Sequence, residues 1–209
     1  MPTLFTFGRG LRNMIGALTL VATTLTIAAP TASASHVDHG SRQAHAAQSC
    51  ANADTPAVHA SGNAIRAAVL CLINQQRVSL RLPALHEQSR LDHSAQGWTN
   101  EMVQQGTFSH GSDFAARITA TGYRWSAAGE NIATGFSTPR AVVTGWMGST
   151  GHCSNILDPS FSDVGTGVGR SVAGKFAAGS VWTQDFAQRM GQPAPSGNWG
   201  PAKGCPYAT

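Results

Sequence analysis

Apolar residues recur at helical spacing from residue 62 onward, before any strand pattern appears. The first stripe has a 3.6-residue repeat and ends near Pro83, which disfavours helix in the residue before it. The second stripe predicts a helix over about 89–105, and Gly106 ends it. The two stripes comprise Ile65, Val69, Leu72, Ile73 and Leu80, and then Leu91, Ala95, Trp98 and Met102.

Two further helices are predicted from their first residues. One covers "SDFAARITATG" with Ser112 or Asp113 as its N-cap. The other covers "STPRAVVTGWMGS", with Thr138 as N-cap and Pro139 at the first helical position.

Strand patterns are fewer and come mostly late in the chain. "ENIAT" is short, "DVGTGVGRS" alternates Val with small residues, and "GSVWTQDFAQ" alternates its side chains between two faces. Helices followed by late antiparallel strands favour an α+β domain, with helices packed on a small sheet.

The first 34 residues are typical of an export signal. Arg9 and Arg12 precede the uncharged run "MIGALTLVATTLTIAAP", and "ASA" supplies a cleavage site after Ala34. A retained membrane anchor is the alternative, but the threonines and Pro30 weaken the run as a span. We therefore expect a secreted, extracellular protein, without a transmembrane span once cleaved, and a monomer.

The charge pattern argues against a nucleic-acid partner. Without Arg9 and Arg12, the chain has 12 of its 14 basic residues and 10 acidic residues, so the cleaved protein has a net charge of +2. Nucleic-acid binding needs a concentrated basic patch, and no Lys/Arg cluster is present in the sequence.

Four cysteines in an exported chain suggest disulfides, and three pairings are open. Cys50 lies in a polar lead-in and Cys205 in a Pro/Gly-rich tail, whereas Cys71 and Cys153 lie within the domain. Pairs Cys50–Cys71 and Cys153–Cys205 would tie both ends of the chain to the domain, which makes this pairing our hypothesis.

Composition divides the rest of the chain into three segments. Residues 35–61 are rich in Ala, Ser and His, and we interpret them as a flexible lead-in whose histidines lack metal-ligand spacing. Residues 62–188 form the domain. Residues 189–209 contain four prolines and are expected to be an irregular tail tied by a disulfide.

Three polar residues stand apart in otherwise apolar or small-residue surroundings: His110, Glu130 and His152. Each needs a polar partner if it is buried, and together they could satisfy one another. Two His and a carboxylate are also a zinc ligand set, but spacings of 20 and 22 residues match no metal signature. Structural placement is therefore favoured on physical grounds alone.

Four ordered motifs carry a resemblance to a known family: "FSHG", "GENIATG", "WMGSTGHCSNILDPSFSDVGTGVG" and "VWTQDF". Together they resemble the CAP superfamily, which comprises cysteine-rich secretory proteins, antigen 5, pathogenesis-related proteins and bacterial secreted SCP-like domains. The resemblance covers about residues 62–188. It implies an α-β-α sandwich with a short, mostly antiparallel sheet between helices.

The resemblance also assigns cavity residues. His110 matches the family's first cavity His, Glu130 the Glu of its G-E-N motif, and His152 the His of its G-H motif. Eukaryotic members have a second cavity Glu three residues after a Trp, whereas here Trp146 is followed at that distance by Ser149. The expected cavity therefore comprises His110, Glu130, Ser149 and His152.

The resemblance implies a secreted binding module for a small apolar ligand, a lipid or a cell-envelope component, rather than an enzyme. The alternative is a zinc-assisted peptidase or hydrolase in which His110 and His152 hold the metal and Glu130 is the general base. The missing second carboxylate weakens that alternative.

Overall fold

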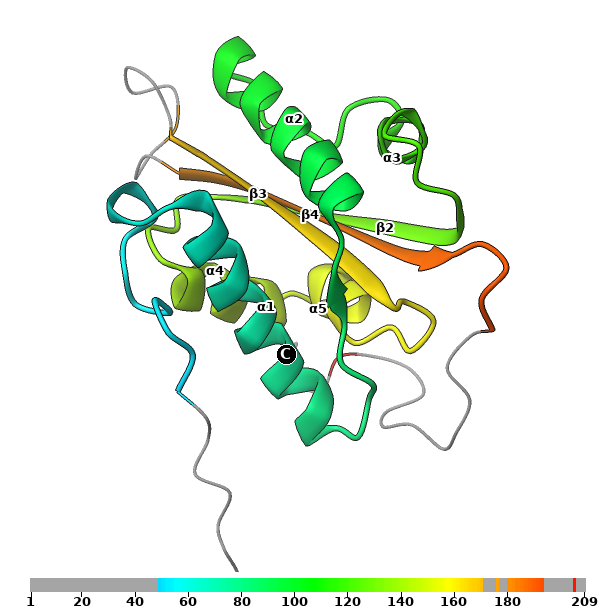
Figure 1. Ribbon diagram of the computed structural model, residues 1–209. Helices are drawn as coiled ribbons and strands as arrows, with labels where there is room; N and C mark the ends of the chain where they lie inside the picture. The colour runs from blue at the N-terminus through cyan, green and yellow to red at the C-terminus, as the bar shows by residue number, and fades with distance from the viewer. Residues whose placement is uncertain (1–48, 171–175, 177–179, 194–204, 206–209) are drawn as a thin grey trace, which may run out of the picture. The chain divides into compact units, whose positions relative to one another are not determined.

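The computed structural model describes residues 49–170, 176, 180–193 and 205 (Figure 1). The expected signal peptide lies outside these residues, as do residues 35–48 of the lead-in and most of the tail. The elements are the 3-10 helix Ala57–His59, α1 (Gly62–Ser79), β1 (His86–Glu87), α2 (Ser89–Gln105), α3 (Phe114–Ala120), β2 (Trp125–Thr134), α4 (Pro139–Met147), α5 (Thr150–Ile156), β3 (Asp163–Arg170) and β4 (Ser180–Arg189).

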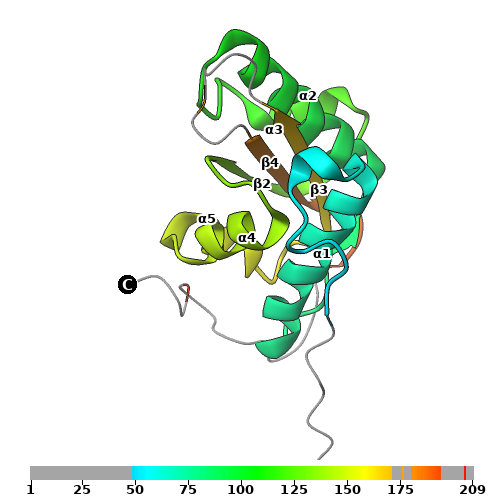
Figure 2. The same ribbon diagram turned by 90° about the vertical axis from the view of Figure 1, so that its left-hand side faces the viewer.

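The sheet has the order β1-β3-β4-β2. Its β3–β4 and β2–β4 pairs are antiparallel, and the short β1 pairs parallel to β3. Helices α2 and α3 cover one face, and α1, α4 and α5 cover the other (Figures 1 and 2). The α+β, three-layer fold expected from the sequence is confirmed.

Each of the four predicted helices is present, but the fourth ends earlier than expected. Its N-cap Thr138 accepts a hydrogen bond from Ala141 N, as predicted, yet α4 stops at Met147. A separate helix, α5, begins at Thr150 and contains His152. His152 therefore follows the fourth predicted helix but lies in a further short helix that the sequence did not predict. Gly148 and the N-cap Ser149 break the chain between the two helices.

The structure joins both cysteine pairs that the hypothesis named, Cys50–Cys71 and Cys153–Cys205. Near the first pair, part of the expected lead-in packs on the domain. Ala53 is buried, and Ala57 N donates to Ser137 O at 2.8 Å. A segment without large apolar side chains is held here by the disulfide and by backbone hydrogen bonds, which composition does not reveal.

Helix α2 lies unusually close to β3, because two strand glycines face it. A Cβ at Gly165 would lie 2.1 Å from Leu91 C, and a Cβ at Gly167 would lie 2.4 Å from Ala95 O. The helix also covers the outer edge of β3: Thr166 N donates to Asp92 Oδ1 at 2.9 Å, and Val168 N donates to Gln96 Oε1 at 3.1 Å. The Val-Gly alternation thus permits backbone contact between a helix and a strand.

Gly165→Ala should destabilise the protein by about 3 kcal/mol, because the new methyl group overlaps helix backbone that cannot rotate away. Gly97→Ala is the matched control: it lies in α2 with nothing within 4 Å of the new Cβ, and it should stabilise by about 0.5–1 kcal/mol. Chemical denaturation of both variants checks this. A Gly165→Ala protein as stable as wild type would contradict the close approach.

A buried arginine connects the end of α1 to the turn after α5. Arg77 is fully buried, and its guanidinium donates to four carbonyl oxygens. The acceptors are Pro83 O at 2.7 Å, Ile156 O at 2.8 Å, Asp158 O at 2.9 Å and Phe161 O at 3.2 Å. Burial lowers the pKa of Arg77 to about 10, so the side chain stays charged at neutral pH. Arg77 therefore sets the position of the helix that carries His152.

Arg77→Lys should lower the free energy of unfolding by about 2–4 kcal/mol, because the single ammonium of lysine cannot reach all four carbonyls that surround the planar guanidinium. Arg81→Lys, four residues on and exposed, should change it by less than about 0.5 kcal/mol. Thermal unfolding of the two variants measures the difference. Equal melting temperatures would show that the carbonyls are satisfied in another way.

Candidate functional site

Glu130 lies near the middle of β2 with a side chain that is only 1% exposed. Both carboxylate oxygens are engaged. His110 Nδ1 lies 2.8 Å from Oε1, and Arg117 Nη2 donates to Oε2 at 2.5 Å. A carboxylate partner favours the proton on Nδ1, which leaves Nε2 as the acceptor of the neutral ring. The charged residue in "GENIATG" is thus paired on both sides.

Arg117, on α3, also fixes the loop that carries His110. Its Nη2 donates to His110 O at 3.1 Å, and its guanidinium lies 4.1 Å from the centre of the Trp98 ring. Gly111, at φ 69°, packs against the same ring, where a Cβ would lie 2.8 Å from Trp98 Cη2. Sequence reasoning placed Trp98 on the core stripe, but it supports the cation that pairs with Glu130.

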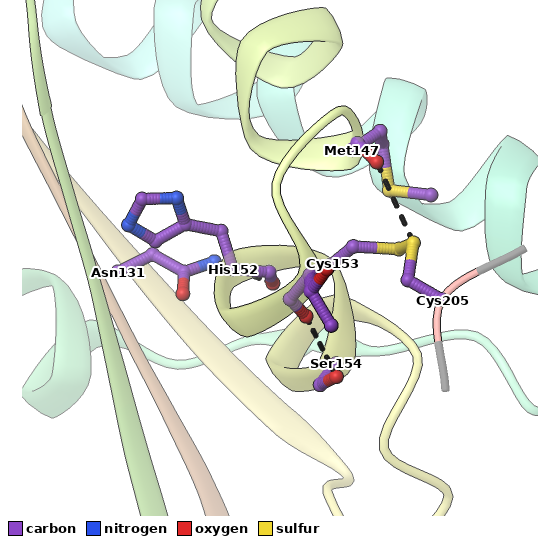
Figure 3. Close-up of a disulfide and its surroundings, with 7 residues drawn as sticks. Asn131, Met147, His152, Cys153, Ser154 and Cys205 are labelled. Carbon is purple, nitrogen blue, oxygen red and sulfur yellow. Dashed lines mark hydrogen bonds between the residues drawn. A yellow bond between two sulfur atoms is a disulfide. The ribbon is translucent and has the colours of Figure 1, made fainter. Parts of the chain in front are cut away.

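His152 is held on the other side of the strand by amide side chains. Asn131 Nδ2 donates to His152 O at 3.1 Å, and Asn155 Nδ2 donates to Glu130 O at 3.1 Å and to Asn131 Oδ1 at 2.9 Å. Figure 3 shows Asn131 beside His152, with the Cys153–Cys205 disulfide on the next residue. Burial, and then the charge of His110, lower the pKa of His152.

A groove of about 450 Å³ runs along the free edge of β2, between the loop that carries His110 and the start of α5. Of the four expected cavity residues, His110, Ser149 and His152 line it. Glu130 does not line the groove, because it lies behind His110. The remaining lining is largely apolar: Phe108, Ile132, Ala133, Phe136, Gly145 and Trp146, with Ser109 and Thr134.

The side chains His110, His152 and Glu130 provide only part of the ligand set that a zinc site needs. Within residues 49–170, 176, 180–193 and 205, no three His, Cys, Asp or Glu side chains are grouped to hold a metal ion. Glu130 uses both oxygens for His110 and Arg117, so it fits the role of a residue that orients a ligand rather than that of a ligand. Zinc stays a prediction that rests on two imidazoles, one fewer than the three protein ligands of catalytic zinc sites.

Two members of the site were missed from sequence: Arg117 and Asp185. Arg117 lies on a short helix, where a cation usually faces solvent, and its partner is 13 residues away. Asp185 lies opposite Glu130 in the β2–β4 register. The sequence signal was one acidic residue within a predicted strand, "VWTQDF".

The three-layer fold and the groove between the two histidines define a class of protein, and comparison of the sequence with known protein families identifies that class. Residues 70–186 match the cysteine-rich secretory protein family, CAP. The chain belongs to this family.

Curated relatives of the chain are both from Bacillus subtilis strain 168. The uncharacterized protein YkwD is 36% identical over 137 residues, which are 63% of this chain and 50% of YkwD. The uncharacterized membrane protein YlbC is 30% identical over 125 residues, 58% of this chain and 34% of YlbC. The chain thus spans half or less of the length of these relatives.

Solved structures agree on the fold. An extracellular protein of Bacillus anthracis with an SCP domain superimposes with a TM-score of 0.52 and 27% identity, over 62% of this chain and 44% of that one. An outer surface protein of Borrelia burgdorferi has the same TM-score of 0.52 at 19% identity, over 58% of this chain and 90% of that one. In the described part of the chain, no helix has both the length and the hydropathy to cross a bilayer.

The two imidazoles should influence each other's protonation. In His110→Ala the pKa of His152 should rise toward its ordinary value, because the nearby positive charge is removed while burial remains. NMR titration of the His152 ring in both proteins measures the shift, with the exposed His93 ring as the internal reference. If the pKa of His152 is the same in both, the two rings do not share one groove.

Proposed function

We propose that this chain is an extracellular binding module, not an enzyme, and that the groove beside β2 takes the apolar part of a small ligand or lipid, including lipids of the cell envelope. The observation that carries the proposal is the groove itself. Its volume of about 450 Å³ falls in the usual range for small-molecule sites, and aromatic side chains form much of its wall.

The composition of the wall supports an amphipathic ligand. Phe108 is 46% exposed although it is large and apolar, and with the half-buried Phe136 it provides surface that a hydrocarbon chain would cover. His110, Ser149 and His152 gather on the same groove and provide polar partners for a head group. A few convergent polar groups in an apolar groove are typical of sites that orient a ligand.

The pairing of Glu130 supports binding over hydrolysis. A general base needs a free oxygen within reach of the proton it abstracts. Glu130 has one oxygen on His110 and the other on Arg117, and it lies behind the groove wall. Ser149, a hydroxyl on the groove, is the N-cap of α5, and no hydrogen bond between it and His152 is present among the described residues.

An extracellular location is supported by three observations. The first 34 residues have the pattern of an export signal, two disulfides join the domain to its flanking segments, and the B. anthracis neighbour is described as extracellular.

Ligand binding can be tested with a matched pair of variants on α5. Ser149→Phe should fill the groove and weaken binding of a fluorescent fatty acid such as cis-parinaric acid at least tenfold, whereas Ser154→Phe, exposed and away from the groove, should bind like wild type. Fluorescence titration gives the affinities, and mass spectrometry of lipids that co-purify with the full chain identifies the natural occupant.

Saturable binding that is unchanged in Ser149→Phe would place the ligand elsewhere. Absence of both saturable binding and a co-purifying apolar molecule would refute the proposal. Peptide or ester turnover by the purified chain, lost in Glu130→Gln, would replace binding with catalysis.

A further inference from the structure

A second carboxyl group lies beside Glu130. Asp185 on β4 is directly opposite Glu130 on β2 in the antiparallel register, so both side chains project from the same face of the sheet. Directly paired residues have Cβ atoms about 4.5–5.5 Å apart. Asp185 is fully buried, and the side chain of Glu130 is 1% exposed. Two acidic groups therefore share one dry site.

The polar groups around Asp185 do not compensate a second negative charge. Among the described residues, neither carboxyl oxygen of Asp185 accepts a hydrogen bond. The Ser94 hydroxyl, from α2, lies near enough to lower the pKa of Asp185. In the same described part of the chain, however, this hydroxyl makes no hydrogen bond of ordinary geometry. From α3, Arg117 gives its Nη2 to Glu130, and from β3 the residue paired with Asp185 is Gly165, which has no side chain.

The charge balance then favours one neutral acid. With both carboxyls ionised, the two negative charges face the single cation of Arg117, and one of them is left buried and unpaired, which is costly. With Asp185 neutral, Glu130 and Arg117 form a balanced pair. A neutral carboxylic acid needs an acceptor for its O–H, and the carboxylate of Glu130 is the adjacent one.

We propose that Asp185 is a positioning residue of this site: it stays protonated, and its O–H donates a hydrogen bond to the carboxylate of Glu130, which holds that carboxylate in place for His110 and Arg117. The inference goes beyond the binding function and does not depend on it. It supplies the second carboxyl that the sequence lacks at Ser149, but from the neighbouring strand and in its neutral form.

The pKa of Asp185 agrees with this assignment. This pKa is raised to about 8, with burial as the largest cause; the nearby Ser94 hydroxyl and the charge of Arg117 lower it, and the charge of Glu130 raises it. At pH 7 the group is mostly protonated. His110 is the remaining titratable group on Glu130, and it contacts the oxygen away from Arg117.

The proton should make stability depend on pH in a defined direction. Between the unfolded pKa near 4 and the folded value of about 8, the folded state holds a proton that the unfolded chain releases, so raising the pH destabilises the fold. Asp185→Asn resembles the protonated acid and cannot ionise. Relative to this variant, the wild-type folding constant should fall by up to about tenfold per pH unit between pH 5 and 7.

Chemical denaturation of both proteins from pH 5 to 9 measures this. Asp163→Asn is the matched control, because Asp163 is also a buried strand aspartate but accepts from Tyr123 Oη at 2.5 Å and from Arg189 Nη2 at 3.4 Å. That variant should be less stable than wild type, since both donors lose a charged acceptor. Parallel pH profiles for wild type and Asp185→Asn would overturn the proposal.

A direct measurement keeps the proposal testable if Asp185→Asn fails to fold. In wild type, the carboxyl carbon of Asp185 should titrate near pH 8 by ¹³C NMR, and in Glu130→Gln the midpoint should move to lower pH, because the neighbouring charge is gone and Arg117 is released. A wild-type midpoint near pH 4 would show that Asp185 holds no such proton, and a midpoint unchanged in Glu130→Gln would show that Asp185 does not interact with Glu130; either result would overturn the proposal.

Discussion

The hydrogen bonds of Arg77 to four carbonyl oxygens are the interaction on which the site most depends. The charged guanidinium is buried with no ion pair within 4 Å among the described residues, although the charge of Asp158 acts on it. It is solvated by backbone carbonyls from the turn after α1 and from the turn after α5. Of these acceptors, Asp158 O also accepts from Phe161 N at 3.4 Å, and the guanidinium supplies the other donors. A single side chain thus satisfies the irregular backbone that links α5 to β3, and it relates α1 to the helix that carries His152.

The site itself is a second example of polar groups that compensate one another in a fixed arrangement. Glu130 balances Arg117 and orients His110, while Asn131 and Asn155 attach α5 to the same strand. The groove wall can then be mostly apolar, because the strong polar interactions lie behind it. This separation suits recognition of a ligand with an apolar chain better than it suits chemistry that needs an exposed carboxylate.

Local signals allowed the prediction of the four main helices, since N-caps such as Thr138 and stripes such as that of α2 depend on neighbouring residues only. Helix α5 was missed because seven residues that include Gly151 make no stripe. His110, Glu130 and His152 could be considered together from their polar character, but only the family resemblance assigned them to one cavity, because each is far from the others in sequence. The pairing of Asp185 with Glu130 depends on strand register, which a single sequence does not specify.

The cover that α2 places over β3 also bears on how the protein behaves at high concentration. An outer strand with free amides and carbonyls invites another chain to add to the sheet. Here Asp92 and Gln96 occupy that row of backbone groups at Thr166 and Val168, and Gln96 Nε2 also donates to Val168 O at 3.0 Å. Two helical side chains therefore make the hydrogen bonds that a neighbouring strand would otherwise make, and they disfavour self-association along this edge of the sheet.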